Sequence, residues 1–113
     1  AYLARIQEYE NMPVAPELEG LQNRLKSMAS KYAACVTQIT EAKDQELLDF
    51  CARRLVEMAA HIIMGHLMVQ DASKSDLFSE SAQVYVRYAE AEVEKHINFI
   101  RKFDKDDLAY YRK

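Results

Sequence analysis

The sequence predicts an all-α fold, an up-and-down antiparallel helical bundle of three long helices plus short terminal helical segments. Half of the 113 residues are hydrophobic and 29% are charged, whereas glycine and proline occur only twice each, a composition typical of helices and poor in turns. Apolar residues recur at alternating spacings of three and four in three long segments, which is the periodicity of a packed helix. Short polar turns join these segments, so each helix should lie antiparallel to the next.

The first fifteen residues are predicted to form a helical stub and a linker. Residues 1–10 fit a helix, and the following stretch NMPVAP (11–16) ends it, because each proline disfavours helix in the residue before it. The chain enters the helical pattern without an initiator methionine, so we expect it to be part of a longer protein. We therefore assign residues 1–15 to a stub and linker from a preceding part of that protein, and residues 16–113 to the bundle domain.

A change of phase separates the first two long helices. Pro16 suits the first turn of a helix, and the apolar seam after it comprises Leu18, Leu21, Leu25, Met28, Tyr32, Cys35 and Ile39. A second seam comprises Leu48, Cys51, Leu55, Met58, Ile62, Gly65 and Val69. It is out of phase with the first, because a continuous helix would carry Glu46 and Arg53 into the core. We therefore predict a turn at residues 40–45, with Asp44 as the N-cap of the second helix.

A third helix is predicted over residues 76–102. The stretch ASKSD (72–76) precedes it, and Ser75 or Asp76 can cap its first turn. Its apolar stripe comprises Phe78, Ala82, Tyr85 or Val86, Ala89, Val93, Ile97, Ile100 and Phe103. The stretch DKDD (104–107) ends this helix or caps a short last one. Three residues of the tail need a docking surface if the tail is ordered, namely Leu108, Tyr110 and Tyr111.

Charge and hydropathy argue against two classes of partner. The net charge of −3 provides no basic face for nucleic acid. The longest stretch without formal charge, residues 58–70, is shorter than the roughly 20 residues that a membrane-spanning helix needs. We therefore expect a cytoplasmic protein that does not bind nucleic acid and does not cross a membrane.

The three histidines are the candidate metal ligands. His61 and His66 lie in the apolar stretch HIIMGHLMVQDAS, and His96 lies in the third helix. A di-iron bundle needs Glu-x-x-His pairs, which aim both ligands at the bundle axis, and this sequence has none. Instead, Glu57 and Glu92 each precede a histidine by four residues, the spacing of pairs on a helix surface. We interpret each histidine as a partly buried imidazole bonded to a carboxylate or a carbonyl, with metal binding as the alternative.

The second long helix is expected to be covered on more than one side. Gly65 costs about 1 kcal/mol in a helix interior relative to alanine, so either a neighbouring helix approaches it closely or a ligand chain lies on it. Met58, Met64 and Met68 fit the core or, alternatively, an adaptable apolar groove. Because residues 58–70 are apolar nearly all round, three helices alone would cover this helix poorly. This pattern indicates a partner surface, either a second copy or the rest of a longer protein.

The sequence contains no catalytic constellation, and no glycine-rich loop that could cradle phosphate. Six side chains that could take part in chemistry are interpreted as structural: Cys35 and Cys51 as reduced core residues, Ser73 and Ser75 as turn residues, and Arg53 and Arg54 as solvated charges. The Arg-Lys pairs at 101–102 and 112–113 are interpreted as solvated charges too. We therefore predict no catalytic, cofactor-binding or metal-binding residue in this segment.

Three stretches in this order carry a resemblance to a known family. They are PELEGLQNRLKSMASKYAACVTQI, LLDFCARRLVEMAAHIIMGHLMVQDASKS and VYVRYAEAEVEKHINFIRKFDKDDLAYYRK. The first two resemble the C-terminal extension of acyl-CoA dehydrogenases of the very-long-chain type, and the last resembles the tail of a bacterial branch of these flavoproteins. The resemblance spans Pro16 to Lys113. It lies in the order of the segments: Pro-Glu-Leu opening a helix, Arg-Leu-Val-Glu-Met-Ala with a long apolar run ending in Ala-Ser, and a charged third helix.

The resemblance implies a parent enzyme that binds FAD and oxidises an acyl-CoA at the α and β carbons, using a glutamate of its main domain. That glutamate and the flavin-binding segments have no matching positions in this chain, so no catalytic or cofactor residue is carried over. In relatives the extension is associated with subunit contacts and, in mitochondrial members, with the inner membrane face. This chain lacks a strongly basic amphipathic helix, so a membrane surface is possible but not favoured.

Our leading hypothesis is a non-catalytic C-terminal domain of an FAD-dependent acyl-CoA dehydrogenase. The domain would pack against the catalytic body or a second subunit of a homo-oligomer, and residues 1–15 would lead from the catalytic body. FAD would belong to the parent enzyme. The alternatives are a free-standing helical protein-interaction module and a small metal-binding bundle.

Overall fold

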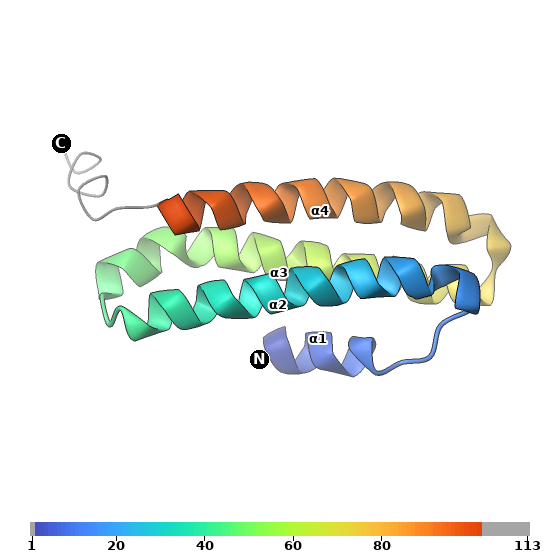
Figure 1. The fold of residues 1–113 in the computed structure, drawn as a ribbon, viewed down its shortest axis with the longest axis horizontal. Coiled ribbons are helices and arrows are strands. Elements are labelled where there is room, and N and C mark those ends of the chain that lie inside the picture. The colour runs from blue at the N-terminus through green and yellow to red at the C-terminus, as the bar shows by residue number, and fades with distance from the viewer. Residues whose placement is uncertain (1, 103–113) are drawn as a thin grey trace.

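The computed structural model describes residues 2–102 and has the all-α fold that the sequence predicts. Its elements in chain order are α1 (Tyr2–Glu10), the 3-10 helix η1 (Pro16–Leu18), α2 (Glu19–Glu41), α3 (Gln45–Lys74), the 3-10 helix η2 (Asp76–Phe78) and α4 (Ser79–Lys102). Figure 1 shows α2, α3 and α4 running up and down as antiparallel neighbours. The predictions for Phe103, for residues 104–107 and for the tail residues Leu108, Tyr110 and Tyr111 fall outside the described residues.

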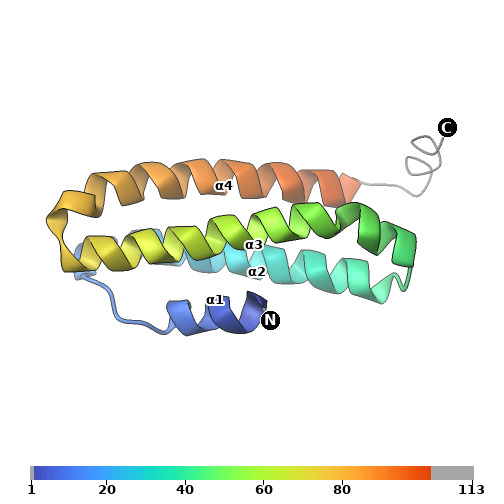
Figure 2. The same ribbon diagram turned by 180° about the vertical axis from the view of Figure 1, so that it is seen from behind.

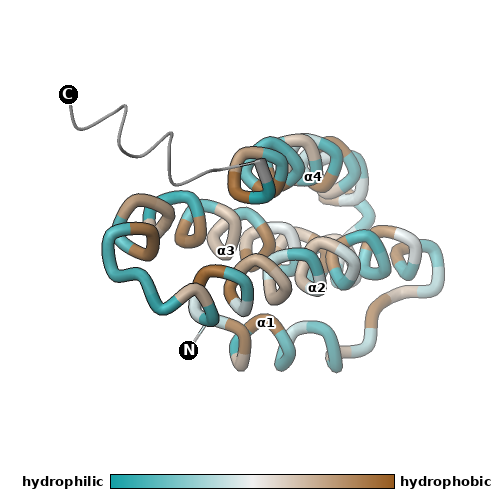
Figure 3. Tube along the Cα trace, turned by 60° about the vertical axis from the view of Figure 1, so that its left-hand side comes forward, coloured by the Kyte–Doolittle hydropathy of each residue, from teal (hydrophilic) through white to brown (hydrophobic). Residues whose placement is uncertain are grey.

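The short helix α1 lies beside α2 and α3, on the side away from α4 (Figure 1). Figure 2 shows α3 in front of α2, with α4 along one edge and α1 along the other. In Figure 3 hydrophobic and hydrophilic segments alternate along each helix, as expected for amphipathic helices that share one core. Helix α3 therefore has neighbours on three sides, and one of its faces points outward between α1 and α4.

Hydrogen bonds tie α1 and its connection to the bundle. Ile6 of α1 is fully buried, and the Gln22 side chain of α2 donates to the backbone carbonyl of Met12 at 2.9 Å. The backbone N–H of Ala15 donates to the Ser73 hydroxyl at 2.9 Å. Ser73 was predicted to lie in a turn, and that prediction is wrong because α3 continues through it to the next residue.

The predicted helix starts are confirmed at two connections. The Asp44 side chain accepts hydrogen bonds from the N–H groups of Glu46 (3.1 Å) and Leu47 (3.3 Å), and therefore caps α3. The Ser75 hydroxyl accepts from the N–H of Leu77 at 3.4 Å and caps η2. Lys43 immediately precedes the Asp44 cap with φ at 52°, a left-handed conformation that turns the chain between α2 and α3.

The predicted seams form the core with two exceptions. Leu48 and Phe78 were placed in the core, but they are 37% and 50% exposed. Both lie in the first turn after a connection, at an end of the bundle, where fewer neighbouring helices can cover them. The remaining seam members are buried or pack against the core, including Leu18, Leu25, Met28, Tyr32, Cys35, Ile39, Cys51, Met58, Ile62, Val69, Ala82, Val86, Ala89, Val93, Ile97 and Ile100.

The close helix approach predicted at Gly65 is confirmed. A Cβ atom at this position would lie 2.6 Å from Cδ2 of Leu25, which is itself fully buried in α2. The three methionines near Gly65 do not act as a unit, because Met58 is buried, Met68 is partly buried and Met64 is 47% exposed. The missing side chain of Gly65 thus lets α2 pack tightly on α3.

We predict that Gly65→Ala lowers the free energy of unfolding by up to about 2 kcal/mol. Overpacking a core typically costs roughly 1–3 kcal/mol, whereas replacing glycine in a helix gains only about 1 kcal/mol. Gly20→Ala is the matched control, because a Cβ at Gly20 meets nothing within 4 Å, and this variant should be neutral or stabilising. Urea unfolding of both variants measures the difference, and a Gly65→Ala variant as stable as Gly20→Ala would contradict the tight contact.

Candidate functional site at the α3–α4 interface

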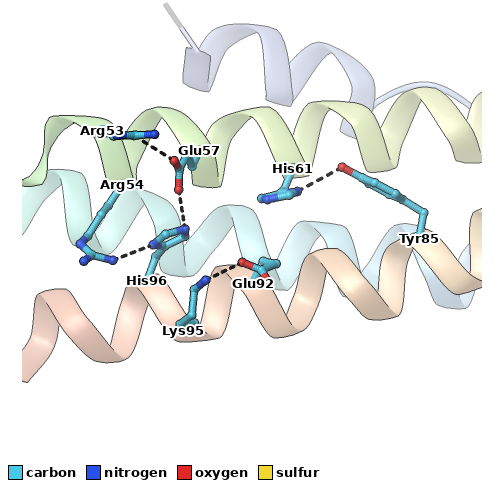
Figure 4. A network of polar contacts seen from close by, with 8 residues as sticks. All are labelled: Arg53, Arg54, Glu57, His61, Tyr85, Glu92, Lys95 and His96. Carbon is cyan, nitrogen blue, oxygen red and sulfur yellow. Dashed lines mark hydrogen bonds and ion pairs between the residues drawn. The ribbon is translucent and has the colours of Figure 1, made fainter.

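A network of polar side chains joins the facing sides of α3 and α4 (Figure 4). Helix α3 contributes Arg53, Arg54, Glu57 and His61, and α4 contributes Tyr85, Glu92, Lys95 and His96. Two of the three histidines considered as ligands from the sequence therefore lie at one interface. Their contacts show what chemistry this interface can support.

His96 is buried at the centre of the network, and both ring nitrogens have polar neighbours. Its Nε2 lies 3.0 Å from Oε2 of Glu57, an ion-pair distance without hydrogen-bond geometry, and its Nδ1 lies 3.2 Å from the Arg54 guanidinium. Because a guanidinium can only donate, Nδ1 accepts, and the proton of the neutral ring is on Nε2 facing Glu57. The nitrogen that could act as a base is thus occupied by Arg54.

Burial lowers the pKa of His96, Glu57 opposes this effect, and Arg54 adds to it. A buried imidazole beside a carboxylate can resemble half of a catalytic triad. Here the lone pair on Nδ1 of His96 accepts from Arg54 inside the fold. The lowered pKa of His96 favours the neutral form of its ring. The arrangement links α3 to α4 through His96.

Arg54 packs against an aromatic ring instead of extending into solvent. Its guanidinium carbon lies 3.6 Å from the centre of the Phe99 ring, a cation–π geometry. The rings of Phe99 and Phe50 stack with their centres 6.1 Å apart. The prediction of a solvated charge is therefore wrong for Arg54, because α4 places Phe99 beneath it. Arg53 fits the prediction, since its side chain is 90% exposed and pairs with Glu57 at 3.3 Å.

His61 contacts two tyrosines of α4. Its Nδ1 lies 3.1 Å from the Tyr85 hydroxyl, and the Tyr88 ring meets it edge-on with the ring centres 5.6 Å apart. Burial, and then the neighbouring Tyr88, raise the pKa of Tyr85, so its hydroxyl stays protonated at neutral pH. Sequence reasoning missed both tyrosines as partners. The only signal for them was the position of Tyr85 beside Val86, on the flank of the apolar stripe.

The two helix-surface pairs suggested by the sequence are not formed. Glu57 contacts His96 across the interface rather than His61 on its own helix. Glu92 pairs with Lys95 at 2.8 Å rather than with His96. A spacing of four places two side chains on one side of a helix, but here the facing helix offers closer partners.

His66 lies apart from this network, on the side of α3 that faces α1. It is 1% exposed, and its ring stacks on that of Tyr9, with 6.0 Å between the centres. Its Nε2 has no hydrogen-bond partner, so the predicted bond to a carboxylate or carbonyl is not seen at this atom. Burial, and then the positive charge of Lys26, lower the pKa of His66 to about 4. The ring is therefore neutral at physiological pH.

The two cysteines are buried, free thiols in α2 and α3. Burial raises the pKa of both Cys35 and Cys51, which keeps them as thiols rather than reactive thiolates. Within residues 2–102, no group of three or more His, Cys, Asp or Glu side chains could hold a metal ion. Over the same residues, no helix has the length and apolar content that would let it span a membrane.

Comparisons with known proteins agree with this architecture. A family model described as "Acyl-CoA dehydrogenase C terminal" matches residues 1–108. The chain belongs to this family. It is also similar to the crystal structure of an acyl-CoA dehydrogenase family protein from Porphyromonas gingivalis, with 48% identity and a TM-score of 0.87, over 91% of this chain and 90% of that one. No curated protein matches the chain.

The family match confirms the resemblance inferred from the sequence order. The structural match covers about nine-tenths of this acyl-CoA dehydrogenase C-terminal domain and about nine-tenths of the similar structure. The ion pairs and ring contacts described above therefore belong to a helical domain of this family. They join its helices, and titration can test both the contact of Glu57 with His96 and the burial of His66.

We predict that Glu57→Gln lowers the pKa of His96 further. The substitution removes the carboxylate that raises this pKa against the effect of burial. The control is Glu92→Gln, because Glu92 has the weakest of the influences on His96 and should shift its pKa less. NMR titration of the imidazole protons of the acyl-CoA dehydrogenase C-terminal domain measures both shifts. Equal shifts in the two variants would contradict the contact between Glu57 and His96.

We further predict that His66 makes the domain less stable in acid. Between about pH 4 and 6.5 the unfolded chain takes up a proton at His66 that the folded chain does not. The free energy of unfolding therefore falls as the pH falls through this window, by at most about 3 kcal/mol, and is restored above it.

The variant His66→Leu should remove this contribution. It should be neutral or stabilising at pH 7.5, because it also removes an unpaired buried nitrogen. Urea unfolding at several pH values compares each variant with the wild type, so that contributions from other groups cancel. A constant difference between wild type and His66→Leu from pH 7.5 to 4 would contradict the prediction.

Proposed function

We propose that this chain is the non-catalytic C-terminal domain of an FAD-dependent acyl-CoA dehydrogenase, and that it stabilises the enzyme through packing and subunit contact. The observation that carries the proposal is the family match over residues 1–108. The parent enzyme would oxidise acyl-CoA at the α and β carbons in a separate catalytic body. The polar groups of the α3–α4 interface support a structural role, because they contact one another inside the bundle.

The described residues lack one common kind of FAD site. Many proteins hold the pyrophosphate of a dinucleotide with backbone N–H groups of a glycine-rich turn. Gly20 and Gly65 both lie within helices and neither has a positive φ, and Leu25 occupies the space beside Gly65. We therefore assign FAD to the catalytic body and no residue of 2–102 to its binding.

The surface of the bundle supports a role in contact with other protein. Several apolar side chains of α3, η2 and α4 are exposed: Val56, Met64, Leu67, Leu77, Phe78, Val84 and Tyr88. Three of them, Leu77, Val84 and Tyr88, line one open groove together with Met68. Clusters of exposed apolar residues of this kind mark interaction surfaces. In the proposed enzyme this surface would meet the catalytic body or another subunit of a cytoplasmic homo-oligomer. Residues 1–15 would form the connection from the catalytic body, entering the bundle as α1.

We predict that removing residues 16–113 from the parent enzyme lowers its stability or its assembly but not its chemistry. The melting temperature should fall by several degrees, since about 1 kcal/mol of lost contact shifts it by roughly 2–4 °C in a protein of about 150–250 residues. Light scattering measures the assembly, and kcat per bound flavin measures the chemistry. The proposal fails if stability and assembly are unchanged, or if kcat is lost in an enzyme that still assembles.

A further inference from the structure

Helix α3 carries a second apolar seam on its outward face, separate from the seam in the core. Val56, Ala60, Ile63 and Leu67 follow one another at spacings of four, three and four, which is the spacing of a helix-pairing seam. Val56 is 47% exposed, Leu67 is 38% exposed, and Ile63 is partly covered. Figure 2 shows that α3 has an uncovered face between α1 and α4, and the exposure of Val56, Ala60 and Leu67 assigns the outer seam to it.

Opposite charges lie at the two ends of the outer seam. Arg53 precedes it and Asp71 follows it, and both are exposed. They are separated by eighteen residues, five full turns of a helix, so they share one side of α3 about 27 Å apart. At this distance Arg53 and Asp71 cannot pair within one chain.

The outer seam matches a second copy of itself that runs in the opposite direction, both in charge and in apolar side chains. Its midpoint lies near residue 62, nine residues from Arg53 and nine from Asp71. An antiparallel second helix would therefore place Arg53 beside the Asp71 of the other copy, and Val56 beside its Leu67. A parallel second helix would instead bring like charges together at both ends. The small side chain of Ala60 near the midpoint lets two helices approach closely.

Helix α4 adds apolar side chains at the same level of the bundle. His61 contacts Tyr85 and Tyr88, so residue 62 of α3 lies level with these tyrosines, in the first half of α4. A two-fold axis at that level brings α4 of one copy to face α4 of the other. Val84 would then lie beside the partner's Tyr88, and both side chains are 53% exposed. The apolar surface thus extends over two helices.

We propose that a second copy of this chain docks on this face, with the outer seams of the two α3 helices antiparallel across a two-fold axis. The bundle measures 52 Å by 23 Å across its broad side, the side seen in Figure 2. That is enough area for the roughly 800 Å² per partner that a typical protein interface buries. This contact between two copies would be the subunit contact of the proposed function. Its role in the enzyme rests on that proposed function.

Charge reversal on the chain of 113 residues tests the antiparallel pairing. Sedimentation equilibrium at low salt should show the wild type as a dimer of the 13.1 kDa chain. Arg53→Asp and Asp71→Arg should each raise the dimer dissociation constant by about tenfold, because each puts two like-charged pairs across the axis. The double variant R53D/D71R should return it to near the wild-type value. Added salt should shrink these differences.

The control is Arg87→Asp, which makes the same charge change at an exposed position of α4 beside α2 residues such as Arg24, away from the outer seam. It should leave the dissociation constant within about twofold of wild type, well below the tenfold change expected for charge reversal at the outer seam. Circular dichroism checks that every variant stays helical.

A wild-type chain that is monomeric overturns the proposal and leaves the catalytic body as the occupant of this face. A dimer that the double variant does not restore overturns the antiparallel register. The enzyme-truncation experiment is unaffected by either outcome, so the two proposals can fail separately.

Discussion

The structure depends on covering α3, whose apolar residues occupy most of its circumference. Burying a large apolar side chain stabilises a fold by about 1.5–3 kcal/mol, so each uncovered side of this helix is costly. Helix α2 covers one side, where Leu25 meets Gly65. Helix α4 covers a second, and α1 covers a third, where Tyr9 stacks on His66. The order of the other helices around α3 follows from this requirement.

The polar groups at the interfaces are explained by the same packing. Where α3 meets α4, the flank of α3 carries charged and aromatic side chains rather than aliphatic ones. Burying their polar atoms requires hydrogen-bond or charge partners. His96 meets this requirement in part, since Arg54 donates to its Nδ1, whereas its Nε2 lies 3.0 Å from Glu57 without hydrogen-bond geometry. His66 does not, since its Nε2 is buried without a partner. The apolar contact with α1 therefore compensates for a polar atom that would be better solvated in water.

The sequence was sufficient to predict the helices but not the contacts between them. Spacings of three and four report which residues share one side of a helix, so the seams and the position of Gly65 in a close crossing were predictable. The Asp44 cap was predictable too, because its partners are two and three residues away. The pairing of Glu57 with His96 depends on how far α3 and α4 are shifted along each other, which no local pattern records. Arg54 was misjudged for the same reason, because Phe99 lies forty-five residues further along the chain.

The distribution of buried polar groups and exposed apolar side chains supports the proposed role in surface contact. A catalytic group needs a free lone pair or a reactive proton where a substrate can reach it. In residues 2–102, the accepting nitrogen of His96 is bonded to Arg54, and His66 is covered by Tyr9 of α1. Burial raises the pKa of both cysteines and keeps them protonated. What the fold leaves exposed is apolar surface, and much of it lies on the outward sides of α3 and α4. Unused apolar area gains free energy only by meeting another surface, so the physical chemistry of this bundle favours association.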